Sequence, residues 1–593
     1  MKWREIMNKL KKILLPLHGE NKERLGRIYQ DKQVYISSVR SSEQPIEEAR
    51  IFHYDMFSFW FSGTGIHNKE RMELFVSVPA SCIPFMDNAK DVDCYLPFED
   101  FLLRAVGPEI TAYTSEMENR NKDAREKARF IVQKTNECIR RRSGLVFDKA
   151  RESFVLKILF YMPLINNSGI NAKSGFKAVR GVLERIRETV THLDEKALLN
   201  QLAVYRHQSE IWEWMTVNHK IAFVANGSIL PRQGDTSGPL RDAVPFLSPK
   251  NLEETIPLSD GTSITGMAVP EGVTVITGGG YSGKSTLLDA LEAGVWRHIP
   301  GDGREYVLAQ PDSVKIYAED GRVVHEMDVS LFFEEISCIN SLKTFSTVHA
   351  SGSVSQAANI IEAVYAGSRV LLIDEDTSAT NFMIRDEQMR RLIHKEPIIP
   401  YTDRVRFLYE REGVSSVLVI GGSSEYLCHA DFILMMENYQ LLDVTAAAKE
   451  MVAGQKVNRN MEGTSWDKYR YWERKEQDQI LPFCRFVSAE NTKLIQIDGC
   501  TADVTKLTAL TSENQLHTLA YFLKKILTEG DGDRWECLDK AEHLCAQIFN
   551  PEIINQIWGN AWQFPPLFEE IRPVDLLGAL FRMRGITLRQ GEK

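Results

Sequence analysis

The sequence predicts an α/β fold, in which a parallel sheet covered by helices forms the central part of the chain. Two observations predict it. A glycine-rich loop stands between a strand-like and a helix-like segment at 273–291, and an unbroken apolar run at 370–373 ends in acidic residues. Both patterns are typical of parallel sheets that bind ligands where their strands end.

The glycine-rich loop runs from Gly278 to Thr286 and reads G-G-G-Y-S-G-K-S-T, which matches G-x-x-x-x-G-K-[ST]. Glycines let successive backbone N–H groups point at an anion, and the N-terminus of the following helix adds its positive end. We therefore expect the loop to bind the phosphates of a nucleoside triphosphate. A plain glycine-rich turn before a helix is the alternative.

Individual roles follow from this pattern. Lys284 is expected to reach the β- and γ-phosphates and to take part in catalysis, and the Ser285 hydroxyl is expected to bind Mg²⁺. The other loop residues expected to contact the nucleotide are Gly278, Gly279, Gly280, Ser282, Gly283 and Thr286. The predicted ligands are ATP and Mg²⁺.

The apolar run Val370–Ile373 has the composition of a central parallel strand buried on both faces. It is followed by Asp374, Glu375 and Asp376. Acidic residues at the carboxyl end of such a strand lie beside phosphates bound at that edge. We expect Asp374 to bind Mg²⁺ and Glu375 to orient and polarise the attacking water. A solvated strand-to-helix turn is the alternative.

Between these motifs, Ser351–Gln356 reads S-G-S-V-S-Q and precedes a helix-like stretch. Small hydroxyl residues and a glycine at a helix start favour a second anion site, whereas an ordinary serine-capped helix is the alternative. Here the chain resembles ABC-type ATPases, whose S-G-G-Q-like signature caps the γ-phosphate held by the opposing subunit. Two frames remain open, one on Ser351 and Gly352 and one that starts at Ser353 and ends on the glutamine.

The resemblance extends over five blocks, NGSILPR (226–232), HIPGDGRE (298–305), AEDGR (318–322), SGSVSQAAN (351–359) and LLIDEDTSATNFMIRD (371–386). Together they resemble the family of predicted ATPases of the ABC class, strongly from about 221 to 447. The resemblance implies a P-loop NTPase core of ABC type flanked by N-terminal and C-terminal α+β domains. Thr377–Thr380 looks like the D-loop. Because ABC-type sites are closed by a second subunit, the resemblance also implies a homodimer.

One departure from transporter ATPases and one candidate residue bear on the site. After the strand-like run 417–420, transporter ATPases carry a switch histidine, whereas this chain has Gly421-Gly422-Ser423-Ser424. Gln310, at the end of the strand-like segment 306–309, is a candidate Q-loop residue. A polar residue that closes an edge strand is the alternative for Gln310.

Composition and length predict a multidomain cytoplasmic protein. The 593 residues divide by motif placement into an N-terminal α+β domain (1–220), the ATPase domain (221–447) and a C-terminal domain with a linker (448–593). No apolar run reaches the length of a membrane span, so we expect no integral membrane segment. The nine cysteines form no C-x-x-C pair, which favours reduced thiols over a zinc site or a disulfide framework.

Two apolar patterns in the first domain favour core packing. The apolar residues between Trp3 and Leu17 recur at helical spacing, which favours a helix packed on the protein's own core over a membrane-surface helix. Phe57, Phe59 and Phe61 alternate, which favours a core strand over a surface that stacks on bases.

A basic segment bears on partners. The net charge of −10 does not suggest nucleic acid, yet residues 120–142 are rich in bases, namely Arg120, Lys122, Arg125, Lys127, Arg129, Lys134, Arg140, Arg141 and Arg142. With the apolar residues Phe130, Ile131 and Ile139, they suggest a basic amphipathic helix that follows a phosphate backbone or is simply solvated.

These observations lead to one function hypothesis and two alternatives. The hypothesis is a soluble ABC-class ATPase that hydrolyses ATP with Mg²⁺ as a homodimer and clamps or remodels nucleic acid, with RNA favoured. The alternatives are an energising ATPase subunit of a membrane transporter and a nucleotide-dependent interaction scaffold.

Overall fold

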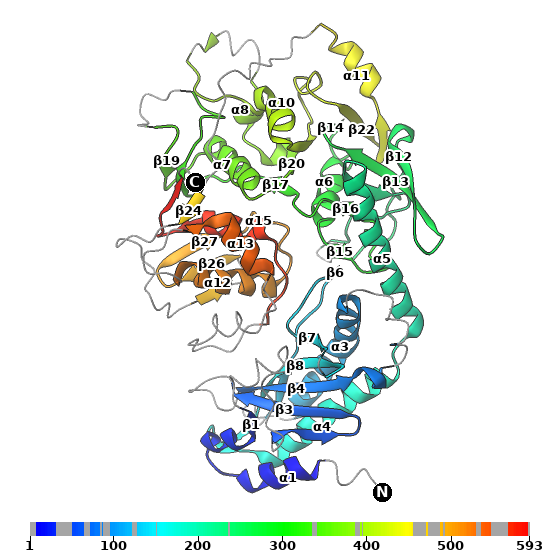
Figure 1. The fold of residues 1–593 in the computed structure, drawn as a ribbon, viewed down its shortest axis with the longest axis vertical. Helices are drawn as coiled ribbons and strands as arrows, with labels where there is room; N and C mark the ends of the chain where they lie inside the picture. The colour runs from blue at the N-terminus through cyan, green and yellow to red at the C-terminus, as the bar shows by residue number, and fades with distance from the viewer. Residues whose placement is uncertain are drawn as a thin grey trace. The chain divides into compact units, whose positions relative to one another are not determined.

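The computed structural model describes residues 7–30, 50–63, 71–83, 86, 95–120, 127–149, 151–234, 238–334, 341–385, 392–393, 395–454, 470–472, 487–489, 493–528, 535–546 and 567–590 (Figure 1). The chain forms two compact units, of which unit 1 comprises 1–203 and 547–570 and unit 2 comprises 204–546 and 571–593. The boundary near 203 falls inside helix α5 (Glu195–Val217), earlier than the expected boundary at 220, and none falls at 447.

Unit 1 is built on a sheet with the strand order β1-β3-β4-β8-β5, in which β2 also pairs with β3 and β7 with β8. Its strands are β1 (Tyr29–Gln30), β2 (Phe52–Tyr54), β3 (Phe57–Gly63), β4 (Arg71–Pro79), β5 (Arg129–Ile131), β6 (Cys138–Ile139), β7 (Leu145–Asp148), β8 (Ser153–Tyr161), β9 (Leu164–Ile165) and β10 (Gly169–Ile170). Its helices are α1 (Asn8–Leu14), η2 (Leu15–Leu17), η3 (Lys22–Ile28), η5 (Ala80–Cys82), α3 (Leu96–Arg120) and α4 (Ala172–Thr191).

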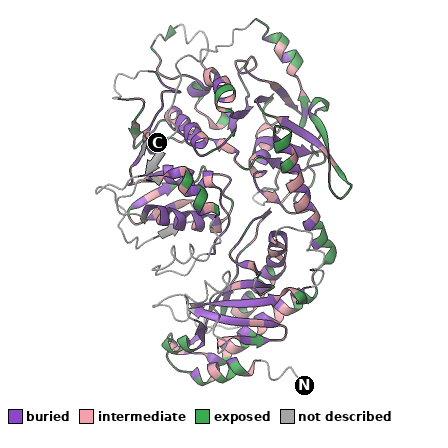
Figure 2. Ribbon diagram, in the orientation of Figure 1, coloured by how far each residue is buried: buried purple, intermediate pink, exposed green. Residues whose placement is uncertain are grey.

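The core of unit 1 confirms the pattern at 57–61 and the described part of the pattern at 3–17, of which residues 1–6 lie outside the described residues. Phe57, Phe59 and Phe61 are buried in β3 and belong to one hydrophobic cluster. Leu10 and Leu14 of α1 are buried in the same cluster, so the N-terminal helix packs on the protein's own core. Figure 2 shows buried residues concentrated along the strands and on the helix faces turned toward them.

The expected basic helix at 120–142 is wrong. α3 ends at Arg120, residues 121–126 lie outside the described residues, and the following chain contains the short strands β5 and β6. Phe130 of β5 stacks on Phe160 of β8 with ring centroids 4.8 Å apart, so its apolar character serves strand packing.

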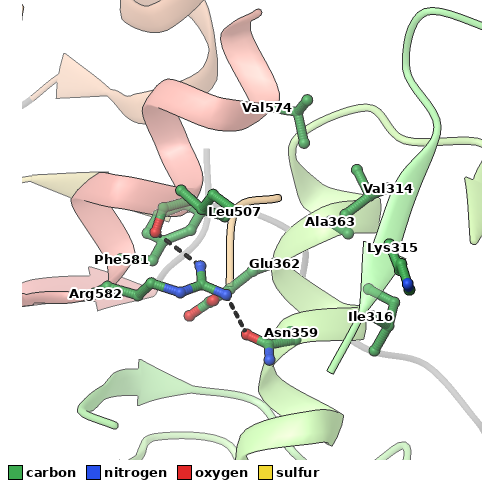
Figure 3. Close-up of a pocket in the computed structure, with 11 residues that line it drawn as sticks. Val314, Lys315, Ile316, Asn359, Glu362, Ala363, Leu507, Val574, Phe581 and Arg582 are labelled. Atoms are coloured by element: carbon green, nitrogen blue, oxygen red, sulfur yellow. Dashed lines mark hydrogen bonds between the residues drawn. The ribbon is translucent and has the colours of Figure 1, made fainter. Parts of the chain in front are cut away.

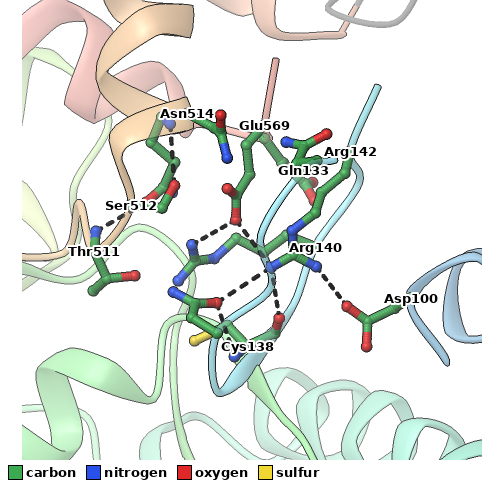
Figure 4. A network of polar contacts seen from close by, with 12 residues as sticks. Asp100, Gln133, Cys138, Arg140, Arg142, Thr511, Ser512, Asn514 and Glu569 are labelled. Atoms are coloured by element: carbon green, nitrogen blue, oxygen red, sulfur yellow. Dashed lines mark hydrogen bonds and ion pairs between the residues drawn. The ribbon is translucent and has the colours of Figure 1, made fainter. Parts of the chain in front are cut away.

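Two basic residues of this segment are buried in ion pairs. The side chains of Arg140 and Arg142 are 0% and 2% exposed, and each guanidinium lies 3.0 Å from Oε1 of Glu569 (Figure 4). Arg142 also pairs with Asp100, whose side chain is fully buried. A buried charge requires such partners. These two guanidiniums are therefore part of the interior of unit 1 and do not face a phosphate backbone.

Unit 2 contains a parallel sheet with the order β17-β20-β21-β14-β22-β23, in which only β23 runs antiparallel to its neighbour within the described residues. Its strands are β14 (Val273–Gly278), β17 (Val314–Ile316), β20 (Val370–Asp374), β21 (Ser415–Val419), β22 (Phe432–Glu437) and β23 (Gln440–Asp443). A second, antiparallel sheet, β12-β13-β11-β16, consists of β11 (Lys220–Ala225), β12 (Glu253–Pro257), β13 (Ser263–Pro270) and β16 (Val307–Ala309).

Helices α6 (Lys284–Ala293), α7 (Gly352–Tyr365), α10 (Tyr401–Glu412) and α11 (Thr445–Met451) pack on strands of the parallel sheet. The other helical segments of this part of unit 2 are η8 (Lys250–Leu252), which packs on β13, η9 (Glu375–Thr377) and α8 (Thr380–Met383). All five residues of β20 are buried, as are all five of β21. This agrees with the expectation that 370–373 is a central strand covered on both faces.

The rest of unit 2 is formed by smaller strands and the C-terminal helices. These elements are β15 (Arg297–His298), β18 (Val324–Met327), β19 (Phe345–Thr347), β24 (Arg470–Trp472), β25 (Val487–Ala489), β26 (Leu494–Ile497), β27 (Cys500–Asp503), α12 (Glu513–Thr528), β28 (Trp535–Glu536), α13 (Cys537–Ala546), α15 (Pro573–Phe581), β29 (Met583–Arg584) and β30 (Leu588–Gln590). No helix among the described residues combines the length and apolar character needed to cross a membrane.

The C-terminal helix α15 packs on α7 through polar contacts. Nη2 of Arg582 donates to Oδ1 of Asn359 at 3.0 Å, and its Nη1 donates to the carbonyl of Gly578 at 2.9 Å (Figure 3). Arg322 pairs with Glu362 of α7 at 2.7 Å. The cavity left beside these groups has a volume of only about 30 Å³. The face of α7 turned toward the C-terminal segment is therefore closely packed.

Candidate functional site

The glycine-rich loop connects β14 to α6, as the sequence predicts. Gly278 has φ +139° and Gly283 has φ +102°, both in the region that favours glycine. A Cβ at Gly278 would lie 2.2 Å from the carbonyl oxygen of Met436 in the neighbouring strand β22. At Gly279 and Gly280 a Cβ would meet nothing within 4 Å. Gly278 is therefore fixed by packing, whereas the next two glycines border open space.

The start of α6 presents donors without a side-chain cap. Its N-cap residue is Gly283, and no side chain accepts a hydrogen bond from the first turn. The first N–H groups of a helix have no partner within the helix, and they form an anion site together with the helix dipole. Ser285 and Thr286 lie in this first turn and are half-buried. The arrangement fits phosphate binding.

Lys284 and Ser282 complete the loop. Nζ of Lys284 donates to the carbonyls of Gly278 at 2.8 Å and Gly279 at 2.7 Å, so its ammonium group lies over the loop. The buried Oγ of Ser282 has no hydrogen-bond partner among the described residues. Beyond its two carbonyl contacts, Nζ of Lys284 has a third N–H that can donate to an oxygen of a bound phosphate.

The acidic motif lies at the same edge of the sheet as the loop. Asp374 ends β20 and is registered with Val419 of β21, which is in turn registered with Ile276 of β14. Asp374 is 2% exposed and accepts a hydrogen bond from the N–H of Asp376 at 3.1 Å. A buried carboxylate and the Ser285 hydroxyl are the oxygen donors that Mg²⁺ prefers, so the residues present fit this ion.

The carboxylate of Glu375 is held by backbone donors. Its Oε2 accepts the N–H of Gly421 at 2.6 Å and that of Gly422 at 3.2 Å. Both glycines follow β21, at the place where transporter ATPases carry the switch histidine. Sequence reasoning missed this contact, because backbone N–H groups leave no side-chain signal. The carboxylate of Glu375 is thus bonded to the backbone that follows β21.

The signature segment begins α7, and the structure separates its serines. Ser351 is the N-cap residue, is exposed, and makes no side-chain capping hydrogen bond. Ser353 is 6% exposed, and its Oγ donates to Oδ1 of Asn381 at 2.9 Å. Gly352, the first residue of α7, is half-buried. Ser351 is therefore the accessible hydroxyl of the segment.

Gln356 connects the signature helix to the D-loop. It is fully buried, and its Nε2 donates to Oγ of Ser378 at 2.9 Å. Its Oε1 accepts the N–H of Ala379 at 2.8 Å. The Oγ of Ser378 also donates to the carbonyl of Asp374 at 2.7 Å. A chain of hydrogen bonds therefore runs from α7 through the D-loop to the acidic motif.

Gln310 does not lie in the parallel sheet. It follows β16 of the antiparallel sheet, and its backbone N–H donates to the carbonyl of Ile221 at 2.9 Å. Its side-chain Nε2 donates to the carbonyl of Lys220, also at 2.9 Å. This is the arrangement of a polar residue that closes an edge strand. A role for Gln310 at the nucleotide stays a prediction.

Comparisons with known proteins bear on this site. Residues 194–470 match the P-loop domain family ABC_ATPase. The uncharacterized protein MJ1628 of Methanocaldococcus jannaschii is 28% identical over 245 residues, which cover 39% of this chain and 54% of that protein. The matched region thus spans about half the length of this relative.

Two solved structures are also similar. One is cbiO1 from Clostridium perfringens, part of the ABC transporter complex cbiONQ. It is 16% identical, the match covers 40% of this chain and 93% of that chain, and the TM-score is 0.25. The other is the ADP conformation of MJ1267, an ATP-binding cassette of an ABC transporter. It is 14% identical, the match covers 41% of this chain and 99% of that chain, and the TM-score is 0.24.

The family match contains every motif described above, from the loop at Gly278 to the glycines after β21. Its residues include the loop between β14 and α6 and the acidic motif after β20 that the sequence predicts. Residues 194–470 therefore form a P-loop domain of the ABC ATPase class.

Proposed function

We propose that this protein binds ATP with Mg²⁺ and hydrolyses it. The observation that carries the proposal is the placement of Asp374 and Glu375 at the same sheet edge as the loop before α6, within one register of paired strands. Mg²⁺, held by Ser285 and Asp374, would neutralise charge on the β- and γ-phosphates.

The chain's own residues account for the chemistry around the γ-phosphate. Lys284 and the N–H groups at the start of α6 bind and orient the phosphates. Glu375 orients the attacking water and accepts its proton as the new P–O bond forms and the bond to the leaving phosphate oxygen breaks. The N–H groups of Gly421 and Gly422 donate to the Glu375 carboxylate and so fix its orientation.

The site would be completed by a second copy of this chain. Ser351 is exposed at the start of α7, with its hydroxyl uncommitted to capping, which suits a contact with the γ-phosphate held by another copy. Ser353 is buried and bonded to Asn381, so we assign the signature serine to Ser351. The proposal is a homodimer that closes on two ATP molecules and opens after hydrolysis.

The proposal includes a nucleic-acid ligand, with RNA favoured, that the closed dimer binds. The support that the basic segment 120–142 gives to nucleic-acid binding is weaker than expected, because Arg140 and Arg142 are buried in ion pairs. Two exposed basic residues of the same segment, Lys134 and Arg141, can still contact phosphate groups. We place the protein in the cytoplasm on the strength of its cysteine usage.

Steady-state ATP hydrolysis with and without single-stranded RNA tests the proposal, with Glu375→Gln as the blank. We expect the blank to lose roughly 10²- to 10⁴-fold in turnover, the usual share of a general base, while ATP binding survives. Stimulation by RNA that disappears in high salt supports the client. Hydrolysis that is the same in wild type and blank refutes the role of Glu375, and tight ATP binding without turnover indicates a scaffold.

A further inference from the structure

The main chain that leads into the signature serine is fixed by the AEDGR block (318–322). The N–H of Ala350 donates to the carbonyl of Arg322 at 2.9 Å, and the N–H of Gly321 donates to the carbonyl of Ala350 at 2.7 Å. Ala350 is buried, whereas Ser351, the next residue, is exposed. The position of the Ser351 hydroxyl is therefore set by how firmly this block holds the residue before it.

Arg584 joins the same two segments from a third part of the chain. Its Nη1 donates to the carbonyl of Val348 at 2.9 Å, and its Nη2 donates to the carbonyl of Gly321. Because a guanidinium group is planar and rigid, it bonds two acceptors at once in a fixed geometry. Arg584 ends β29 and is registered with Thr501 of the neighbouring strand β27. The small sheet of the C-terminal residues thus holds this guanidinium group against the signature segment.

Arg582, two residues earlier, holds the rest of the AEDGR block and the signature helix. Its guanidinium group lies 2.5 Å from Oε1 of Glu319, and it donates to Oδ1 of Asn359 in α7, as Figure 3 shows. The side chains of Arg582 and Glu319 are 8% and 11% exposed, so breaking this pair would leave a buried charge unpaired and strongly destabilise the fold. Arg584 is half-buried, and its two acceptors described above are neutral carbonyls. Its removal therefore affects the signature segment more selectively.

We propose that Arg584 is a positioning residue for the signature serine, which it places for contact with the γ-phosphate held by a second copy of this chain. This role rests on the proposed function, in which Ser351 completes the ATP site of the other copy. Arg584 acts through the carbonyls of Val348 and Gly321, and the AEDGR block is the support through which it does so. The C-terminal residues thereby control hydrolysis at a site whose phosphate-binding loop belongs to the other copy.

Steady-state ATP hydrolysis by the whole protein with Arg584→Ala tests this role. Misplacement of a group by about 1 Å lowers rates by up to about 100-fold, so we expect kcat to fall by roughly 10- to 100-fold. Calorimetric titration with MgADP, which has no γ-phosphate for the serine to contact, should give the wild-type affinity. Arg584→Lys keeps the charge but not the two-bond geometry, so it should recover part of the lost kcat. A wild-type kcat in Arg584→Ala overturns the proposal.

Arg572 provides a matched control in the same C-terminal segment. It also donates to two carbonyls, those of Pro311 at 3.1 Å and Ser313 at 2.8 Å, which lie outside the AEDGR block and the signature segment. Arg572→Ala leaves the buried Asp575 without this ion pair, so we expect it to lower the melting temperature more than Arg584→Ala does. Its kcat should nevertheless stay close to the wild-type value. An equal fall in kcat for both variants would indicate a general loosening of the C-terminal segment and would overturn the proposal.

Mixed dimers separate positioning across the two copies from a general defect. Arg584→Ala keeps its own loop and impairs its signature serine, whereas Lys284→Ala does the reverse. In an equimolar mixture, half of the dimers contain both variants and have one intact site of two, so we expect about a quarter of wild-type hydrolysis. Ser351→Arg carries its defect in the same segment as Arg584→Ala, so a mixture of these two should show no recovery. Arg584→Lys in the same mixtures gives the test with a smaller perturbation of the fold.

The outcomes distinguish this role from the proposed function. Recovery with Lys284→Ala but not with Ser351→Arg supports the role of Arg584. Recovery with both or with neither, while Lys284→Ala and Ser351→Arg restore each other, overturns the role of Arg584 and leaves the shared ATP site standing. If the wild type does not hydrolyse ATP, or if Lys284→Ala and Ser351→Arg do not restore each other, the proposed function fails and the role of Arg584 fails with it.

Discussion

The connection between α7 and the D-loop can be measured by removing the Gln356 side-chain amide. Gln356→Leu keeps most of the volume and deletes three hydrogen bonds, two that Nε2 donates to Ser378 and to Sδ of Met383 and one from the N–H of Ala379. Each bond is worth about 1 kcal/mol, and a buried donor left unpaired costs about 1–3 kcal/mol. Because Ser378 and Ala379 are only half-buried, water compensates part of the loss. We expect unit 2 to lose about 2 kcal/mol of stability, in the middle of that range.

Urea unfolding followed by tryptophan fluorescence measures this loss. Gln356→Glu retains an acceptor for the N–H of Ala379 but places a carboxylate at a fully buried position, so we expect it to lose more stability than Gln356→Leu. ATP hydrolysis should fall in both variants, since the D-loop leads to Asp374. A midpoint for Gln356→Leu equal to that of the wild type refutes the reasoning.

Three further predictions follow from single contacts. Gly278→Ala should destabilise the ligand-free protein by about 2 kcal/mol or more through backbone strain and the clash with Met436; Gly279→Ala, whose Cβ meets nothing, should be neutral in the same thermal melt, and equal losses would contradict the assignment. Asp374→Asn should raise the Mg²⁺ concentration for half-maximal hydrolysis by at least roughly tenfold, whereas the exposed Asp376→Asn should not; a shared shift would remove Asp374 as the ligand. Burial raises the pKa of the Cys138 thiol to about 11, so iodoacetamide at pH 8 should alkylate the half-buried Cys82 and leave Cys138 unmodified in the native protein; equal labelling by mass spectrometry would contradict its burial.

The short-range patterns of this sequence predict its structure well. Strand, loop and helix follow one another within 273–293, so a glycine pattern and an apolar run suffice to place β14 and α6. The same holds for β20 and Asp374. Where a feature is determined by neighbours in the chain, composition and spacing carry the information.

Features determined by distant residues were not predictable. Arg140 and Arg142 look like surface bases in sequence, because their partners Asp100 and Glu569 lie far away in the chain. The contact of Glu375 with Gly421 and Gly422 uses backbone N–H groups, which every residue except proline possesses, so no side-chain pattern reveals it. The hydrogen bond from Nε of Arg304 to the carbonyl of Leu230 likewise joins residues that lie far apart in the chain, so the sequence does not reveal it.

A mixing experiment tests the central claim, an ATP site shared by two copies, most directly. Lys284→Ala removes the phosphate-binding lysine, and Ser351→Arg blocks the signature serine, so each variant alone should be inactive. In an equimolar mixture, half of the dimers contain both variants, and one of their two sites combines an intact loop with an intact serine. We therefore predict recovery of about a quarter of wild-type hydrolysis, as expected for a twofold dimer with exchanging subunits. A mixture that stays as inactive as its components, or full activity of Ser351→Arg alone, would contradict the shared site.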